Sequence, residues 1–324
     1  MQDKILDLLK RSQGYLSGEE ISNRLKISRQ TLWKYIQDLR DAGYDIVAVP
    51  HLGYQLVSCP DRLFPCEITH NLNTKFIGKR ISYFDTVSST MDIAVEMGMR
   101  GCVEGAIVIA EGQSRGRGRF NREWFSPKYK GIYLSLILRP RIAPNAAPIL
   151  TLLAAVSICE AIKEVTGIDA RIKWPNDILI HNKKLAGILT EISAETDITH
   201  FVVIGLGLNV NNDKKSLIAG ATSLAEQKKE KISRTELLQE ILRRIEGNYL
   251  ELQENSAGAI LDKWRKSNLT LGRRVRVVSN KNTREGQALD IDTDGALLIR
   301  NDSGLIEKVM AGDIVHCREH QCLK

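Results

Sequence analysis

Residues 112–127 decide the fold, and they read GQSRGRGRFNREWFSP. The stretch holds four arginines within eight residues, with glycines among them: Arg115, Arg117, Arg119 and Arg122. Arginine carries a fixed charge on a planar guanidinium that binds phosphate or carboxylate through two hydrogen bonds at once. Glycine lets the backbone come close to a ligand. Because neither residue type suits a packed helix or strand, the stretch is predicted to be a loop.

The loop follows one apolar strand, residues 106–110, and precedes another, residues 132–138. A basic loop between two core strands is a candidate lid over an anionic substrate. Trp124 and Phe125 favour this interpretation, because two large aromatic residues at the end of a polar loop indicate that it folds over something. Composition alone leaves a solvated basic loop and a nucleic-acid contact open.

Two further motifs accompany the loop: residues 173–177, KWPND, and residues 184–189, KLAGIL. Together with Gln113, the GRGR run at residues 116–119 and Trp124, they resemble the biotin–protein ligase family in their order and spacing. The N-terminal segment makes the chain similar to the bacterial bifunctional type of this family, a ligase that also represses biotin-synthesis genes. The resemblance covers nearly the whole chain.

Length and composition are those of a soluble globular protein. The 324 residues suit two or three domains, and 43% of them are hydrophobic and 26% charged. No apolar run approaches the roughly 18 residues of a membrane span, and the N-terminus lacks a signal-peptide core. The cysteines form no CxxC pair, so reduced thiols of a cytoplasmic protein without a membrane partner are expected: Cys59, Cys66, Cys102, Cys159, Cys317 and Cys322.

Residues 1–60 are predicted to form a winged helix-turn-helix DNA-binding domain. Three helices are expected, the second capped by Ser17 and the third by Ser28, followed by a hairpin wing. The third helix offers a polar face, whose candidate DNA contacts are Ser28, Arg29, Gln30, Thr31, Trp33, Lys34 and Gln37. A plain three-helix bundle with a solvated polar face is the alternative.

Bulk charge does not make this segment a strong nucleic-acid binder. Residues 1–60 hold 8 Lys and Arg against 7 Asp and Glu, so they carry only +1 of the chain's net charge of +7. DNA binding is therefore expected to depend on local placement of side chains and on dimerisation.

Residues 66–269 are predicted to form the central domain, after a linker with two prolines. The serine–threonine run at residues 88–90 is expected to cap a helix, and an apolar helix over residues 147–165 should be buried. The resemblance implies an α/β ligase domain with a mixed sheet, like that of class II synthetases. The GLGLN run at residues 205–209 lacks the third glycine of a dinucleotide fingerprint, so its glycines are expected to let a ligand lie against the sheet.

Residues 270–324 change to short strands separated by turn-like sequences. The resemblance implies a small SH3-like β-barrel here. The whole chain is thus expected to be an α+β multidomain protein.

The resemblance implies a reaction in two steps. The carboxylate of biotin attacks the α-phosphate of ATP to give biotinyl-5′-adenylate and pyrophosphate, and a lysine amine of a carrier domain then attacks the mixed anhydride. Because the first step joins two anions, the site must supply fixed positive charge. Lys184 and Arg119 are expected to be catalytic, with Lys184 between the carboxylate and the α-phosphate. Lys173 ranks lower, because a lysine that ends a strand has a structural explanation.

The resemblance also implies the ligand contacts. The biotin-binding residues are Ser89, Thr90, Gln113, Gly116, Arg117, Gly118, Arg119, Lys184, Gly187, Gly205 and Gly207. The ATP-binding residues are Arg119, Arg122, Trp124, Asn176, Lys184 and Asn209. Asn176 and Asn209 are also candidate ligands for Mg²⁺, which the phosphates would hold in part, so no dedicated protein metal site is expected.

The chain departs from the family's pattern at two places. Phe120 and Asn121 replace an arginine and a glycine of the loop, which predicts a stiffer loop with a larger apolar contribution to its closure. Met91 stands where relatives carry asparagine, so the resemblance assigns it no role.

The expected partners are operator DNA of biotin synthesis and transport genes, a second copy of the chain when biotinyl-adenylate is bound, and the carrier domain of acetyl-CoA carboxylase and related carboxylases. Two rival functions are open. A lipoate or octanoate ligase shares the general architecture, although the arginine–glycine loop argues against it. A regulator that senses biotinyl-adenylate without transferring it is the second rival.

Overall fold

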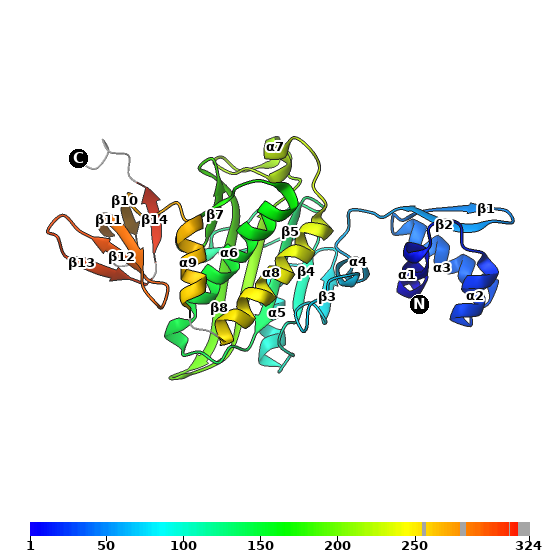
Figure 1. Cartoon of the computed structure of the whole chain (residues 1–324), viewed down its shortest axis with the longest axis horizontal. Coiled ribbons are helices and arrows are strands. Elements are labelled where there is room, and N and C mark those ends of the chain that lie inside the picture. Colours follow the sequence, from blue (N-terminus) through cyan, green and yellow to red (C-terminus); the bar gives the residue numbers. More distant parts are fainter. Residues whose placement is uncertain (255–256, 279–282, 311, 317–324) are drawn as a thin grey trace. The chain divides into compact units, whose positions relative to one another are not determined.

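The computed structural model describes residues 1–316 except 255–256, 279–282 and 311. Two compact units make up the chain, Met1–Arg62 and Leu63–Lys324 (Figure 1). The finer division of the second unit at residues 269 and 270 stays a prediction. Cys317 and Cys322 lie outside the described residues.

The first unit is a helix-turn-helix followed by a hairpin. Its elements are α1 (Gln2–Arg11), α2 (Gly18–Leu25), α3 (Arg29–Asp41), β1 (Asp45–Val49) and β2 (Gly53–Ser58). Both predicted caps are present: Ser17 Oγ accepts from the amide of Glu20 at 3.2 Å, and Ser28 Oγ accepts from that of Thr31 at 3.0 Å. Gly53 turns into β2 with a φ of +111°, and a Cβ there would lie 2.1 Å from the Leu16 carbonyl oxygen. The hairpin can therefore lie against the loop before α2 only because residue 53 is glycine.

The second unit is built on a seven-stranded sheet in the order β3-β4-β5-β9-β8-β7-β6. Its strands are β3 (Ile81–Phe84), β4 (Ile107–Ala110), β5 (Gly131–Leu138), β6 (Arg171–Lys173), β7 (Asp177–Ile180), β8 (Lys183–Glu195) and β9 (Ile198–Asn209). Only the β3–β4 pair is parallel, which confirms the predicted mixed sheet. The strands β4 and β5 are buried along their whole length, as their continuous apolar sequences require.

Helices cover both faces of this sheet. They are α4 (Pro65–Thr69), α5 (Thr90–Met99), α6 (Pro148–Thr166), α7 (Leu224–Lys228), α8 (Arg234–Glu254) and α9 (Gly258–Ser267). Figure 1 shows α6, α8 and α9 side by side on one face. Alternate residues of β4 and β9 belong to two separate hydrophobic clusters, with Met91 and Ala94 of α5 in the smaller one. Hence α5 lies on the opposite face.

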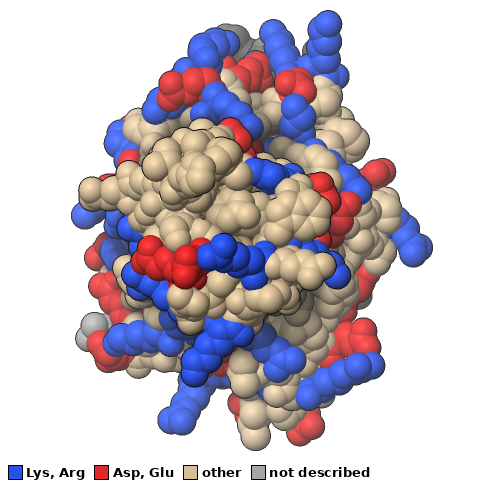
Figure 2. Space-filling view, turned by 90° about the vertical axis from the view of Figure 1, so that its right-hand side faces the viewer, with Lys and Arg blue, Asp and Glu red and all other residues tan. Residues whose placement is uncertain are grey.

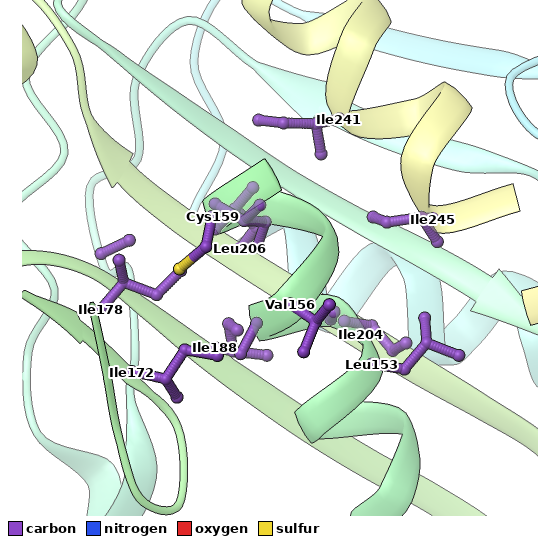
Figure 3. Close-up of a cluster of buried hydrophobic side chains, with 14 of the residues drawn as sticks. Leu153, Val156, Cys159, Ile172, Ile178, Ile188, Ile204, Leu206, Ile241 and Ile245 are labelled. Atoms are coloured by element: carbon purple, nitrogen blue, oxygen red, sulfur yellow. The ribbon is translucent and has the colours of Figure 1, made fainter. Parts of the chain in front are cut away.

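The main core forms where α6 and α8, which lie next to each other, pack on this face of the sheet. Val156 and Cys159 of α6 lie near Ile204 and Leu206 of β9 in Figure 3. The segment Pro144–Thr166 is long and apolar enough to cross a membrane by composition, but 72% of its most apolar window is buried inside the protein. Burial raises the pKa of the Cys159 thiol to about 12, so this cysteine behaves as a small apolar residue.

A five-stranded antiparallel sheet completes the second unit, in the order β13-β12-β11-β10-β14. Its strands are β10 (Arg274–Val278), β11 (Thr283–Ile291), β12 (Leu297–Arg300), β13 (Ile306–Val309) and β14 (Asp313–His316). Short strands are what the sequence predicted for residues 270–324. The indole nitrogen of Trp174 donates to the Gly295 carbonyl oxygen at 3.0 Å, which ties this sheet to the KWPND motif.

Candidate functional site

A cavity on the α5 face of the large sheet gathers most of the predicted ligand contacts. The predicted residues that line it are Ser89, Thr90, Gln113, Arg117, Gly118, Arg119, Arg122, Trp124, Asn176, Lys184, Gly187, Gly205 and Gly207. We call this cavity the ligand pocket. Asn209 and Gly116 do not line it. Asn209 is buried and donates to the Thr222 carbonyl oxygen at 3.1 Å, so its predicted contact with ATP or Mg²⁺ remains a prediction.

Glycines form the floor of the pocket. Gly187 of β8 and Gly207 of β9 are partners across the sheet. A Cβ at Gly207 would lie 2.4 Å from the indole of Trp124, so only glycine there lets the indole lie against the strand. A Cβ at Gly205 would lie 2.4 Å from the sulfur of Met91. Met91, to which the sequence assigned no role, is thus a wall of the pocket.

A chain of hydrogen bonds fixes Gln113 at the pocket. The Gln113 Oε1 accepts from the amide of Thr90 at 2.8 Å and from its hydroxyl at 3.2 Å. Gln113 Nε2 donates to Ser126 Oγ at 3.0 Å, and Ser135 Oγ donates to Thr90 Oγ1 at 2.9 Å. The sequence missed Ser126 and Ser135, because a lone serine near or within a strand carries no local signal. The network holds the amide of Gln113 and the hydroxyl of Thr90 in fixed orientations at the pocket.

Ser89 differs from the prediction that it caps α5. It occupies the N-cap position, but its side chain makes no capping hydrogen bond. The side chain is 1% exposed, and among the described residues its Oγ has no hydrogen-bond partner. Leaving a buried hydroxyl unsatisfied costs about 1–3 kcal/mol, so a hydroxyl that lines a cavity in this state is placed to meet a ligand. The Trp124 indole nitrogen is in the same state.

A buried ion pair anchors the start of the arginine loop. Arg234 at the start of α8 binds Glu111 at 2.8 Å, and both side chains are fully buried. Glu111 Oε1 also accepts from the amide of Leu63 at 2.8 Å. Because Glu111 directly precedes Gly112, these contacts fix the point at which the loop leaves β4. No sequence pattern indicated this pair.

Three of the four loop arginines, Arg117, Arg119 and Arg122, are paired with carboxylates. Arg117 binds Asp92 and Glu191, each at 2.7 Å. Arg122 forms an ion pair with Asp313 of β14, and Arg119 lies 3.5 Å from the same carboxylate. Burial lowers the pKa of Arg119, against the opposing effect of Asp313 and Asp177. A desolvated guanidinium interacts with an anion more strongly than one in water.

Phe120 and Asn121, which replace an arginine and a glycine of the family's loop, form a bend in the loop. Both residues have φ values near +55°, at +55° and +56°, in the left-handed region. The ring of Phe120 is 47% exposed and lies 5.0 Å from the guanidinium of Arg119 and 5.9 Å from that of Arg122. In this structure the ring contacts the charges of its own loop, and its apolar contribution to closure stays a prediction.

The two motif lysines lie in different surroundings. Lys184 Nζ is 2.7 Å from Asp177 and 5.5 Å from the centre of the Trp124 ring, inside the ligand pocket. Lys173 does not line that pocket. Burial lowers the pKa of Lys173, and the charge of Lys184 acts in the same direction, against the effect of Asp177. The placement favours Lys184 as the cation at the reacting centre.

The predicted DNA face of α3 is largely open to solvent. Trp33 is 57% exposed, and Gln30 and Lys34 are exposed beside it. Arg29 forms an ion pair with Glu19 of α2 at 2.7 Å. Ser28, Thr31 and Gln37 complete the set predicted to contact DNA. Figure 2 shows lysines and arginines scattered among carboxylates on one face of the molecule, and residues 1–60 carry a net charge of only +1.

The fold and site define a class of protein: a ligase domain with an anion pocket, joined to a helix-turn-helix. The chain matches three family models, the "HTH domain" at residues 2–55, the "Biotin/lipoate A/B protein ligase family" at 83–209 and the "Biotin protein ligase C terminal domain" at 270–317.

Curated relatives and a solved structure narrow the class. The bifunctional ligase/repressor BirA of Bacillus subtilis is 41% identical over 93% of each chain. Its namesake in Escherichia coli is 30% identical over 96% of this chain and 95% of its own length. The biotin protein ligase of Aquifex aeolicus in complex with biotin and ATP is 29% identical, with a TM-score of 0.64 over 74% of this chain and 99% of that one. The chain belongs to the biotin–protein ligase family, in its bifunctional ligase/repressor branch.

Proposed function

We propose that this chain joins biotin to a lysine of a carrier domain at the expense of ATP, and that the adenylate it forms turns it into a transcriptional repressor. The observation that carries the proposal is the ligand pocket, where Lys184 and the loop arginines face a glycine floor and a fixed polar network. A pocket of this kind suits a ligand with an uncharged polar end and an anionic end.

In the first step an oxygen of the biotin carboxylate bonds to the α-phosphorus of ATP, and the bond from that phosphorus to the bridging oxygen breaks. Lys184, which lines the pocket, would neutralise both reacting anions, and Arg119 would approach the phosphate from the loop. Ser89, Thr90 and Gln113 hold the uncharged end of biotin. Fixed cations lower the barrier because they are oriented before the reaction begins.

In the second step the amine of an acceptor lysine attacks the carbonyl carbon of the adenylate. The bond to the phosphate oxygen breaks, AMP leaves with the electron pair, and the amine loses a proton. Trp124 covers the glycine floor and would shield the anhydride from water until the acceptor arrives. The acceptor is the carrier domain of acetyl-CoA carboxylase or a related carboxylase.

Magnesium would come with the nucleotide. Within residues that the structure describes, no group of three or more His, Cys, Asp or Glu side chains could hold a metal. Both ends of the Asn176 amide are engaged, the oxygen by Arg119 at 3.2 Å and the nitrogen by the Ile188 carbonyl at 2.8 Å. This donor set fits an ion held mainly by phosphate oxygens and water. Bound there, Mg²⁺ would offset phosphate charge.

As a repressor, the chain would form a homodimer when it binds biotinyl-adenylate. The dimer would bind a two-fold symmetric operator of biotin synthesis and transport genes. The near-neutral charge of residues 1–60 supports this, because one copy should bind DNA only weakly. Two copies held at half-site spacing would combine their contacts with the operator. A cytoplasmic location suits both the DNA and the carrier partner.

The test uses purified full-length chain, acceptor domain, ATP with Mg²⁺ and labelled biotin or labelled lipoate. Label should appear on the acceptor with biotin and ATP together, and lipoate should give little. The matched family model covers both acids, so transfer of lipoate in place of biotin would favour the lipoate ligase. Adenylate formation without any transfer would favour a sensor that does not turn over.

A further inference from the structure

The two ends of the arginine loop meet at the buried side chains of Glu111 and Arg234, which we call the loop clamp. Glu111 directly follows β4, and Gly131 begins β5, so these two residues mark where the loop starts and ends. Arg234 Nη1 donates to Glu111 Oε2 at 2.8 Å and to the Gly131 carbonyl oxygen at 3.0 Å. One guanidinium group therefore joins both ends of the loop.

Stability alone does not account for a charged pair at this place. Both side chains of the loop clamp are 0% exposed, so both charges are removed from water. Replacing a buried ion pair by apolar side chains of similar volume is often neutral or stabilising, because the cost of desolvation offsets most of the attraction. What the charged pair supplies, and apolar side chains cannot, is strong hydrogen bonds of fixed direction to buried main-chain groups.

Several segments of the chain end on the Glu111 side of the loop clamp. Its Oε1 accepts from the amide of Leu63 at 2.8 Å and from the hydroxyl of Tyr83 in β3 at 3.3 Å. Its amide donates to the Phe84 carbonyl oxygen at 3.0 Å, and its carbonyl oxygen accepts from the amide of Tyr129 at 3.2 Å. These bonds hold the base of the loop closed against β3 and against the end of the loop itself.

Further hydrogen bonds carry this constraint from the base of the loop to the ligand pocket. The amide of Gln113 donates to the Ser126 carbonyl oxygen at 3.2 Å, and the Gln113 side chain bonds Ser126 and Thr90. A Cβ at Gly116 would lie 2.6 Å from the Trp124 carbonyl oxygen, so the two halves of the loop also touch there. Gln113 and Trp124 both line the pocket, so a shift at the base would displace two of its walls.

We propose that Glu111 and Arg234 are positioning residues that set how fast biotin and biotinyl-adenylate leave the pocket, because they keep the base of the loop closed. This rests on the proposed ligase function. Neither side chain lines the ligand pocket, so both act through Gln113 and Trp124. Lys184 belongs to β8 and not to the loop, so the chemical steps at saturating biotin depend on the loop clamp far less than ligand retention does.

Glu111→Gln combined with Arg234→Met in the full chain tests this. The double change removes both charges, so no buried charge is left unpaired, and it removes the bond to the Gly131 carbonyl. Three quantities are measured: the rate of tryptic cleavage after the loop arginines without ligand, the dissociation rate of biotinyl-adenylate, and KM and kcat for biotin. Cleavage, dissociation and KM should each rise on the order of tenfold, as expected for lost charged hydrogen bonds. The kcat should stay within about threefold.

Glu246→Gln is the matched control. Glu246 is a buried carboxylate of the same helix, and it accepts from the amides of Lys75, Phe76 and Ile77 at 2.6, 2.9 and 2.9 Å. Its loss should lower the unfolding temperature but leave loop cleavage and adenylate dissociation at their native rates.

Two further variants complete the test. Arg234→Lys keeps the charge and should keep loop cleavage and adenylate dissociation within about threefold of native. If the first double variant does not fold, Glu111→Gln combined with Arg234→Gln is measured in the same way, because it also lacks the guanidinium that joins the two ends of the loop.

Native rates of loop cleavage and adenylate dissociation in a folded double variant would overturn the inference and leave the ligase function standing. Equal increases in Glu246→Gln would also overturn it, because they would trace the effect to lost stability. If the native chain transfers no biotin, the proposed function fails. Faster loop cleavage in the double variant alone would then still support a clamp at the base of the loop.

Discussion

At the scale of single residues, the cations of the ligand pocket are held in place by carboxylates that a substrate would replace. Lys184 forms an ion pair with Asp177, and Arg117 forms ion pairs with Asp92 and Glu191. Arg119 and Arg122 are paired with Asp313. These pairs orient the cations at little cost, because half-exposed ion pairs contribute only about 0–1 kcal/mol. A phosphate or carboxylate can therefore compete for them.

Lys184→Ala should reduce adenylate formation far more than Lys173→Ala. Removing the cation between two reacting anions costs about 3–4 kcal/mol or more, the scale of a lost oxyanion donor, whereas Lys173 does not line the ligand pocket. Initial rates of pyrophosphate release measure both. Equal defects would show that the two lysines are ranked wrongly.

Arg119→Gly should leave adenylate synthesis partly intact and weaken retention of the product. One charged hydrogen bond to the adenylate phosphate is worth about 1.5–3 kcal/mol, so dissociation should speed up by about 10- to 100-fold. Stopped-flow release of biotinyl-adenylate gives the rate. A native off-rate in the variant would contradict a loop that closes over the phosphate.

At the scale of elements, the pocket depends on two strands that lack side chains where Trp124 approaches. Sequence reasoning found Gly205 and Gly207 of β9 because a GLGLN run inside a strand is unusual. Gly187 of β8 was found only through the family resemblance. It could not find Ser126 and Ser135, which join the network only once β5 and the loop are folded together. Nor could it foresee that Ser89 would be left unbonded in place of capping α5.

Gly207→Ala should weaken binding of biotinyl-adenylate. The new methyl group would lie 2.4 Å from the Trp124 indole, so the ring must leave the floor of the pocket. Overpacking of this kind costs about 1–3 kcal/mol, or on the order of tenfold in affinity. Titration with biotinyl-adenylate gives the dissociation constant. Gly247→Ala in α8 is the control, since no atom lies within 4 Å of a Cβ there, and equal affinities in both variants would exclude a closely packed indole.

At the scale of the whole molecule, the sequence was most informative where local patterns decide the structure. Caps, apolar periodicity and turn residues predicted the helix-turn-helix and the short C-terminal strands, whereas the mixed sheet was implied by the resemblance to the biotin–protein ligase family. It was least informative where residues far apart in the chain meet, as in the Glu111–Arg234 pair and the contacts of Asp313 with the arginine loop. Such contacts form only in the folded topology, so no local sequence pattern predicts them.

The central claim is that one intermediate, biotinyl-adenylate, serves both transfer and repression. A ligand can shift the chain toward a DNA-binding dimer only by binding that state more tightly. Operator affinity and sedimentation of the full chain are measured without ligand, with biotin, with biotinyl-adenylate, and with biotinyl-adenylate plus excess unbiotinylated acceptor. Biotinyl-adenylate should promote dimerisation and tighten operator binding more than biotin does, and the acceptor should reverse both effects. An operator affinity that does not change with biotinyl-adenylate would contradict the account. The chain would then be a ligase whose helix-turn-helix is not controlled by biotinyl-adenylate.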